Sequence, residues 1–286
     1  SPYIMEGDYS GFDTNMPPEI GTAASTVVYE VCKQFGYSDA SLEILRGILS
    51  DGLYPILELN KDLFAKNGYQ PSGKYGTAED NSLRGLILLM YAWYATPELR
   101  ESSFFEQVQP VIYGDDVLVA VKPDFVDRFN NVTYQQKCAD LYGMKFTNAA
   151  KSMDCAEYLS WGEVSFLKRT FTYSQTNDGG IVGRLSVNSL YKSSRWYIPS
   201  KAVTLSQQHL SSLNSLLIEL FAYVDGEEQF MHARERLAAY YADQYSRSLS
   251  SVRKLLLTYS DGYEIYWGET GSTDSASEEG DDRRAV

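Results

Sequence analysis

Features that mark several other protein classes are missing from this 286-residue chain. Its three cysteines, Cys32, Cys138 and Cys155, have no paired spacing, which argues against a disulfide framework or a zinc site and fits a reducing compartment. The longest nearly unbroken apolar run, 86–95, is about half of the ~20 residues that a membrane-spanning helix needs. The sequence also lacks a Gly-Lys-Ser/Thr phosphate loop, which excludes a P-loop nucleotidase.

Positive charge is scarce as well, since the formal net charge is -13. Part of this excess is local, because the stretch 269–286 holds six acidic residues against two arginines. The segment 145–201 has the opposite balance, with eight Lys and Arg residues against four Asp and Glu residues. Phosphate binding depends on where charge lies more than on its total, so the acidic balance does not exclude a nucleic-acid partner.

The hydrophobic pattern predicts an α+β fold. A strand at 3–8 precedes helices at 19–35 and 41–50, and a β-hairpin follows at 54–66. The later predicted elements are a helix at 78–95, a β-hairpin at 108–121, a helix at 124–142, an extended segment at 163–172, and helices at 204–223, 228–245 and 248–259. This order is typical of an antiparallel sheet with helices on one face, followed by a mainly helical domain. We predict domains at 1–175 and 176–268, with a disordered acidic tail at 269–286.

The turn of the second hairpin carries two adjacent aspartates, Asp115 and Asp116, between β-branched strands. Taken alone, such a pair more often satisfies backbone groups of the turn. Carboxylates at the end of a buried sheet are also ligands for hard cations such as Mg²⁺. Asp8 ends the first predicted strand, so Asp8 and Asp115 could share two metals ~3.5–4 Å apart if the strands are neighbours, as in-line nucleotidyl transfer requires.

A third polar segment precedes the long helix at 78–95. It contains Ser72 and Gly73, then Thr77, which is a plausible N-cap, and Asn81 one turn into the helix. Hydroxyl and amide groups on a glycine-containing loop can bind a ribose, whose 2′-hydroxyl both donates and accepts hydrogen bonds. With Asp13, these side chains could distinguish ribonucleotides from deoxyribonucleotides.

Together, these segments resemble motifs A to E of the RNA-dependent RNA polymerases of positive-strand RNA viruses, and most closely the picorna-like group. The motifs occur in the expected order, as 8–13 (Asp-Tyr-Ser-Gly-Phe-Asp), 71–82 (Pro-Ser-Gly, Thr and Asn-Ser), 113–116 (Tyr-Gly-Asp-Asp), 142–152 (Tyr-Gly-Met to Lys-Ser) and 166–169 (Phe-Leu-Lys-Arg). The departure from the pattern is Lys74-Tyr75-Gly76, where small or proline-rich residues are expected.

The resemblance implies a right-hand polymerase fold, with a palm domain that carries a small fingers-derived insertion near 38–70 and a helical thumb. Asp8 and Asp115 would bind two Mg²⁺ ions, with Mn²⁺ as a substitute, helped by Asp116 and the Tyr9 carbonyl. Asp13, Ser72, Gly73 and Asn81 would bind the nucleotide, with support from Thr77. Lys151 would be the general acid, with Lys145 as its competitor, and Lys168 and Arg169 would contact the primer strand.

The resemblance also implies the biological setting. We expect part of a viral polyprotein that acts in replication complexes in the host cytoplasm, with RNA template and primer, ribonucleoside triphosphates and other replication proteins as partners. Most of the fingers domain would lie before Asp8, so we expect these 286 residues alone to be weak or inactive.

Two alternative functions remain from the sequence. A reverse transcriptase shares the Tyr-x-Asp-Asp turn, but it should carry a bulky aromatic side chain against the 2′-hydroxyl, where this chain has Asp13 and Asn81. A non-catalytic RNA-binding palm is the other alternative, and the complete set of acidic residues argues against it. His209 and His232 have no partner at metal-ligand spacing, so we interpret both as structural.

Overall fold

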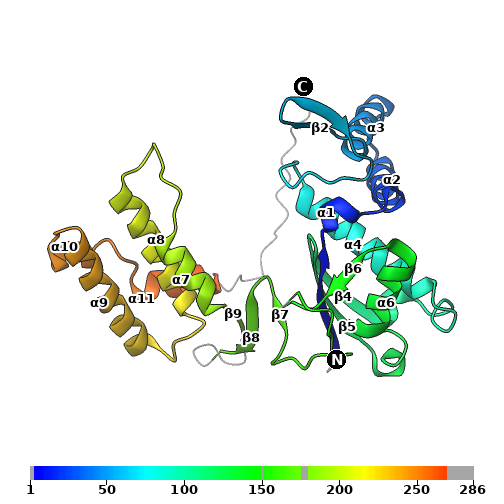
Figure 1. Ribbon diagram of the computed structural model, residues 1–286. Coiled ribbons are helices and arrows are strands. Elements are labelled where there is room, and N and C mark those ends of the chain that lie inside the picture. Colours follow the sequence, from blue (N-terminus) through cyan, green and yellow to red (C-terminus); the bar gives the residue numbers. More distant parts are fainter. Residues whose placement is uncertain (1–2, 150, 175–179, 269–286) are drawn as a thin grey trace, which may run out of the picture. The chain divides into compact units, whose positions relative to one another are not determined.

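The computed structural model describes residues 3–149, 151–174 and 180–268 (Figure 1). The chain divides into two compact units, Ser1–Leu167 and Lys168–Val286. This division lies before the boundary at 175 that the sequence predicted, because β8 (Arg169–Tyr173) and β9 (Ile181–Leu185) pair with each other across that position. The predicted disordered tail at 269–286 lies outside the described residues.

An antiparallel sheet of four strands, in the order β4-β5-β1-β6, forms the centre of the first unit (Figure 1). Its strands are β1 (Ile4–Ser10), β4 (Val108–Tyr113), β5 (Asp116–Val121) and β6 (Lys145–Thr147). Gly7 of β1 is paired with Val117, and Asp8 of the same strand with Thr147 on the other side. The predicted neighbourhood of the first strand and the second hairpin is therefore confirmed.

One face of the sheet packs on helices around an apolar core. Alternate side chains of the strands, such as Met5, Val119 and Phe146, are fully buried there, as the period of two in a half-buried strand requires. Trp93 of α4 and Tyr134 of α6 cover them. This arrangement confirms the predicted α+β class, with helices on one face of an antiparallel sheet.

The first unit has helices near the predicted positions and two short ones, at 12–15 and 104–107, that the sequence did not predict. They are α1 (Phe12–Asn15), α2 (Pro18–Gln34), α3 (Asp39–Leu53), α4 (Thr77–Tyr94), α5 (Phe104–Gln107), the 3₁₀ helix η1 (Pro123–Phe125) and α6 (Asn131–Tyr142). Pro18 occupies the first turn of α2, and the Ser38 side chain accepts a hydrogen bond from Ser41 N at the start of α3. A separate hairpin of β2 (Ile56–Leu59) and β3 (Asp62–Ala65) lies within 38–70, where the sequence predicts the insertion.

Two expectations for the first unit were wrong. The continuous helix predicted at 124–142 is interrupted, because Asn130 is extended and forms a capping box with Thr133 that starts α6. Thr77 is not an N-cap, since the capping position of α4 is Gly76 in the left-handed region with φ of 72°. The Thr77 hydroxyl instead donates to the carbonyls of Lys74 and Pro71.

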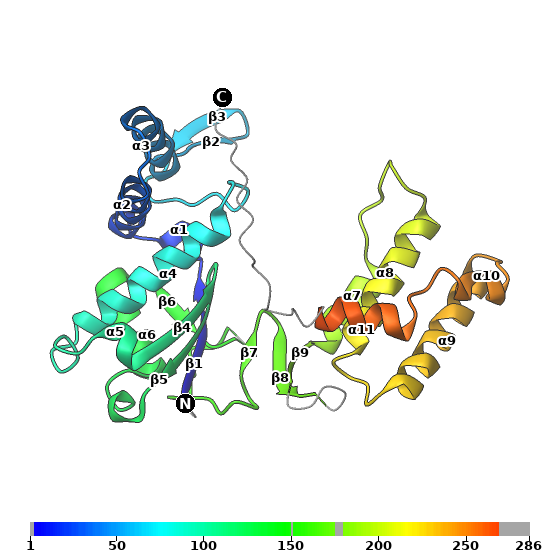
Figure 2. The ribbon, with the colours of Figure 1, turned by 180° about the vertical axis from the view of Figure 1, so that it is seen from behind.

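The second unit combines the β8–β9 hairpin with helices (Figure 2). Its helices are α7 (Val187–Arg195), α8 (Leu205–Leu220), α9 (Glu227–Gln244), α10 (Leu249–Arg253) and α11 (Tyr259–Trp267). Leu217, Phe230 and Val252 lie in its core. The single helix predicted at 248–259 is wrong, because a capping box of Thr258 and Asp261 starts α11 separately. Within the described residues, no helix is long and apolar enough to cross a membrane.

Candidate active site

The first unit brings its acidic motif residues together at the end of β1 and at the β4–β5 turn. They surround a polar cavity of about 260 Å³ that is lined by 8–13, Asp115, Thr147 and Lys151. Asp115 lies in the turn beside Gly114, whose φ of 62° suits glycine. Antiparallel pairing of β1 and β5 thus places Asp8 and Asp115 side by side from positions more than a hundred residues apart.

The Asp115 carboxyl group is partly buried and lies near two other acids. Burial raises the pKa of Asp115, and the negative charges of Asp8 and Asp13 raise it further, against the lowering effect of a backbone hydrogen bond. Asp8 Oδ1 is buried, and no described group donates a hydrogen bond to it. Because an unpaired buried carboxylate oxygen is costly, this corner of the cavity favours a bound cation.

Not all predicted metal ligands converge here. Asp116 does not line the cavity; it pairs with Tyr113 at the base of the turn, and its charge raises the pKa of Glu6, behind burial as the main cause. Within the described ranges, no group of three or more His, Cys, Asp or Glu side chains forms a ready-made metal site. The described acids thus offer a pair, Asp8 and Asp115, and the roles of Asp116 and of the Tyr9 carbonyl stay predictions.

Lys151 reaches the same cavity from the segment after β6. Its Nζ lies 3.4 Å from Asp8 Oδ2, although the side chain is 79% exposed. Its backbone has a φ of 62° and donates to the Asn148 carbonyl, while the Asn148 side chain accepts a hydrogen bond from Ser152 N. The competitor Lys145 pairs with Ser10 in the sheet and does not line the cavity. The geometry therefore favours Lys151.

The predicted ribose-binding side chains also meet. Ser72 Oγ donates to Asp13 Oδ2 at 2.5 Å, and Asn81 Nδ2 donates to Asp13 Oδ1 at 2.9 Å. Asn81 is 5% exposed, and its Oδ1 has no hydrogen-bond partner among the described residues. Gly73 has open space around its α-carbon. Asp13 thus connects the loop before α4 to the helix itself. Asn81 Oδ1 remains as an acceptor without a donor among the described residues.

A contact that the sequence reasoning missed joins the two halves of the site. Ser82 Oγ accepts a hydrogen bond from Gly114 N at 2.9 Å and donates to the Ala78 carbonyl at 2.6 Å. α4 approaches β4 closely here, as Gly85 shows: a Cβ at this position would lie 3.2 Å from the Ile112 side chain. Only the position of Ser82 next to Asn81 hinted at this role, since a serine inside a helix more often bonds its own helix.

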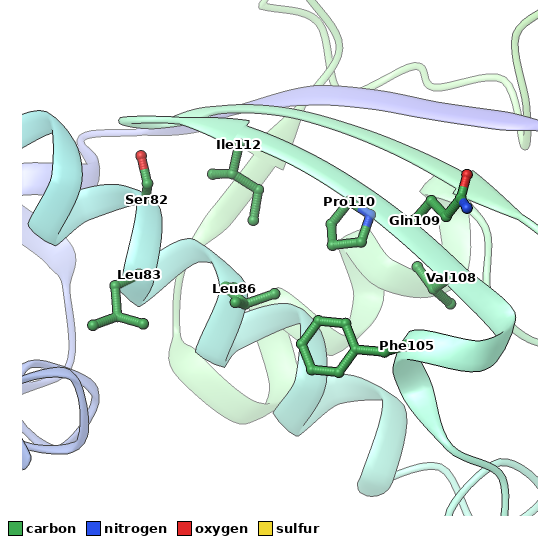
Figure 3. Close-up of a pocket in the computed structure, with 8 residues that line it drawn as sticks. All are labelled: Ser82, Leu83, Leu86, Phe105, Val108, Gln109, Pro110 and Ile112. Atoms are coloured by element: carbon green, nitrogen blue, oxygen red, sulfur yellow. The ribbon is translucent and has the colours of Figure 1, made fainter. Parts of the chain in front are cut away.

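A second cavity, of about 500 Å³, lies between α4 and β4 (Figure 3). Leu83 and Leu86 of α4 face Val108 and Pro110 of β4 across it. Its lining contains no ionisable side chain, so it offers no acid or base for catalysis.

The two predicted primer-contacting residues belong to the second unit. Arg169 forms a two-pronged ion pair with Glu219, with N–O distances of 2.6 and 2.8 Å, and it also donates to the Gly183 carbonyl. The hydrogen bond to Glu219 is the main cause that raises the pKa of Arg169. Lys168 is exposed and its carbonyl accepts a hydrogen bond from Ser186 N. Contact of either residue with RNA stays a prediction.

Residues 1–242 match the family described as viral RNA-dependent RNA polymerase. The chain is similar to the genome polyprotein of Deformed wing virus, with 27% identity over 59% of this chain and 6% of the relative. It is similar to the RNA1 polyprotein of Tomato black ring virus (strain MJ), with 24% identity over 86% of this chain and 11% of the relative. A solved structure, the Sicinivirus 3Dpol RNA dependent RNA polymerase, aligns with a TM-score of 0.66 and 18% identity over 93% of this chain and 50% of that one.

Proposed function

This chain belongs to the viral RNA-dependent RNA polymerase family, and we propose that it carries the palm and thumb that add ribonucleotides to an RNA 3′-hydroxyl on an RNA template. The observation that supports this proposal most is one cavity that holds Asp8, Asp115 and Lys151 beside the hydrogen-bonded set of Asp13, Ser72 and Asn81. The chain spans half of the aligned polymerase structure and a small part of the polyproteins, so activity is proposed for the whole enzyme.

Asp8 and Asp115 would hold divalent metal ions, which this family generally uses, and we propose two Mg²⁺ ions with Mn²⁺ as a substitute. The residues fit such ions, because no group in the described part of the chain donates to Asp8 Oδ1 and both side chains offer the oxygen ligands that hard cations prefer. Bound metal would supply an activated 3′-hydroxyl and charge stabilisation for the leaving group. Asp116 and the Tyr9 carbonyl would complete the ligand set.

Lys151 would donate a proton to the pyrophosphate leaving group. Its ammonium group lies at the edge of the acidic pair, 3.4 Å from Asp8, where a positive charge also stabilises the charge that develops on the departing phosphate. In the second unit, exposed Lys168 would contact the primer strand. Arg169 would do so only by leaving or sharing its ion pair with Glu219.

Asp13, Ser72 and Asn81 would select the ribose. A ribose hydroxyl can donate to Asn81 Oδ1, which has no partner among the described residues, whereas a deoxyribose leaves that buried oxygen unpaired. The single Ser72 proton is donated to Asp13, which holds this part of the site in place. We therefore expect the enzyme to favour ribonucleotides over deoxyribonucleotides by more than about tenfold. A smaller ratio would remove this role and favour the reverse transcriptase alternative.

The polymerase would act on RNA template and primer with ribonucleoside triphosphates, alongside other viral replication proteins, in replication complexes in the host cytoplasm. Its relatives are parts of viral polyproteins, which supports a setting among other viral products.

The decisive test uses the full-length polymerase that contains this chain. We expect Asp115→Ala to lower nucleotide incorporation about a thousandfold or more, because the proposed metal would lose one of its two converging carboxylates. Asp116→Ala should abolish incorporation as well, and circular dichroism should show that both variants stay folded. Asp124→Ala, which removes an exposed acid of η1, should leave activity unchanged. Full synthesis by both turn variants would contradict the mechanism, whereas a wild-type protein that binds RNA without incorporating nucleotides would favour the non-catalytic RNA-binding palm.

A further inference from the structure

The loop that carries Ser72 is anchored by a set of charged side chains that the polymerase motifs do not explain. At its centre is Asp80, on the first turn of α4. Its carboxylate accepts hydrogen bonds from Arg84 at 3.1 and 3.3 Å and from Gln70 at 2.8 Å, and Lys74 Nζ lies 3.6 Å away. Three side chains from the loop and the helix thus converge on one acid.

Most of this network is buried. Arg84 is 1% exposed and Gln70 is 0% exposed, so the arginine charge depends on Asp80 as its counter-ion. The Arg84 side chain also fits closely against α2, where a Cβ on Gly21 would lie 3.2 Å from Nη1. The inner part of the network is therefore a rigid support for the start of α4.

The support reaches the ribose-binding side chains by two routes. Gln70 N donates to the Asp13 carbonyl at 3.0 Å, so the residue that holds Asp80 also holds Asp13. Lys74 lies two residues after Ser72 in the same loop, and its carbonyl accepts a hydrogen bond from the Thr77 hydroxyl at 2.6 Å. Lys74 therefore takes part in the contacts that hold the loop carrying Ser72.

The position of Lys74 follows from the space that a neighbouring helix leaves for it. Its side chain is 32% exposed, and Nζ lies against Gly52 of α3, where any Cβ would collide with it. The lysine is therefore directed inward, toward Asp80. This residue begins the Lys74-Tyr75-Gly76 segment in which the loop departs from the polymerase pattern.

We infer that the Lys74–Asp80 ion pair, supported by buried Arg84, positions the 71–77 loop so that Ser72 and Asp13 can distinguish a ribose from a deoxyribose. This inference rests on the proposed function. Lys74 and Asp80 are positioning residues, because they act through Ser72 and Asp13 and do not themselves contact the sugar. A loop tethered in this way presents the Ser72 hydroxyl in one orientation before the nucleotide arrives.

The test compares Lys74→Met, Lys74→Arg and wild type in the full-length polymerase. We expect Lys74→Met to lower the ratio of kcat/KM for a ribonucleotide to that for its 2′-deoxy analogue about five- to tenfold, since a partly buried ion pair is lost. The loss should fall on the ribonucleotide, with deoxyribonucleotide incorporation unchanged. Lys74→Arg keeps the positive charge, so its ratio should stay close to that of the wild type. Arg46→Met, which breaks an exposed ion pair with Glu43 on α3, is the matched control and should leave the ratio unchanged.

Hydrogen exchange gives a readout that does not need activity. In an Asp115→Asn background, Lys74→Met should speed exchange of the Lys74 and Thr77 amides, which donate to the Pro71 and Lys74 carbonyls, and Lys74→Arg should not. If the wild type discriminates between the two sugars and Lys74→Met discriminates equally well, this inference alone is overturned. The same holds if Lys74→Met leaves the exchange rates of the Lys74 and Thr77 amides unchanged. A wild-type enzyme without sugar discrimination would overturn the proposed ribose selection, and this inference with it.

Asp80→Asn is the less suitable variant, because it also removes the counter-ion of buried Arg84 and is expected to impair folding. Lys74→Met leaves the Asp80–Arg84 pair in place, so a lower melting temperature for Asp80→Asn than for Lys74→Met is expected. Equal melting temperatures would contradict the role assigned to Arg84.

Discussion

The two sides of the cavity are held in place by different means. Asp8 and Asp115 belong to a central strand and to a turn that two paired strands close, so the backbone of the sheet sets their positions. Ser72 and Lys151 belong to loops and reach the site through side-chain contacts with Asp13 and Asp8. The sheet therefore fixes the acidic pair, whereas we expect that the Ser72 and Lys151 side chains can be altered without disturbing the fold.

The largest effect that sharpens this comparison is expected from Lys151→Met. Its side chain is 79% exposed, so stability should change little, whereas loss of the general acid should lower kcat about a hundredfold. Single-nucleotide incorporation and a thermal melt on the full-length polymerase measure both quantities. Lys145→Met is the matched control, because Lys145 is exposed in β6 and does not line the cavity. A larger loss from the control would assign the acid to Lys145.

A substitution in the sheet should mainly lower stability, in contrast to Lys151→Met, which should mainly lower kcat. A Cβ at Gly7 would overlap the ring of Phe146, which is fully buried against Tyr9 and Tyr134, so Gly7→Ala should lower the free energy of unfolding by about 1–3 kcal/mol. Denaturant titration checks this value. Adding Phe146→Leu should recover part of the loss if the overlap is its cause. Full stability of Gly7→Ala would show that this part of the sheet is less rigid than its packing indicates.

The smallest effect is expected from Ser82→Ala, where the helix meets the turn. The variant removes the acceptor of the Gly114 N hydrogen bond, and a net loss of about 1 kcal/mol in unfolding free energy should accompany a several-fold lower kcat. Ser82→Thr keeps the hydroxyl and should retain more activity than the alanine variant. Activity equal to wild type in Ser82→Ala would show that the strands alone position Asp115.

Much of the site follows from local signals along the chain. The β-branched strands around Gly114 predict the hairpin, and the ribose-binding set of Asp13, Ser72 and Asn81 is found by its spacing and its resemblance to a family. The neighbourhood of the first strand and the hairpin is a condition for the shared metal site, and the pairing of β1 with β5 meets it. Where local signals compete, prediction failed, as at Asn130, whose capping box interrupts a segment with helical periodicity.

The amino-acid sequence by itself determined the fold class, the family and the residue types of the site, because hydrophobic period, turn chemistry and motif order are properties of short segments. Only the tertiary structure decided that Lys151 and not Lys145 contacts Asp8, that Arg169 is paired with Glu219, and that Ser82 bonds the turn at Gly114. It also placed Lys74 Nζ 3.6 Å from the Asp80 carboxylate. Each of these contacts joins side chains that tertiary packing brings together, so the spacing of the residues along the chain does not predict it.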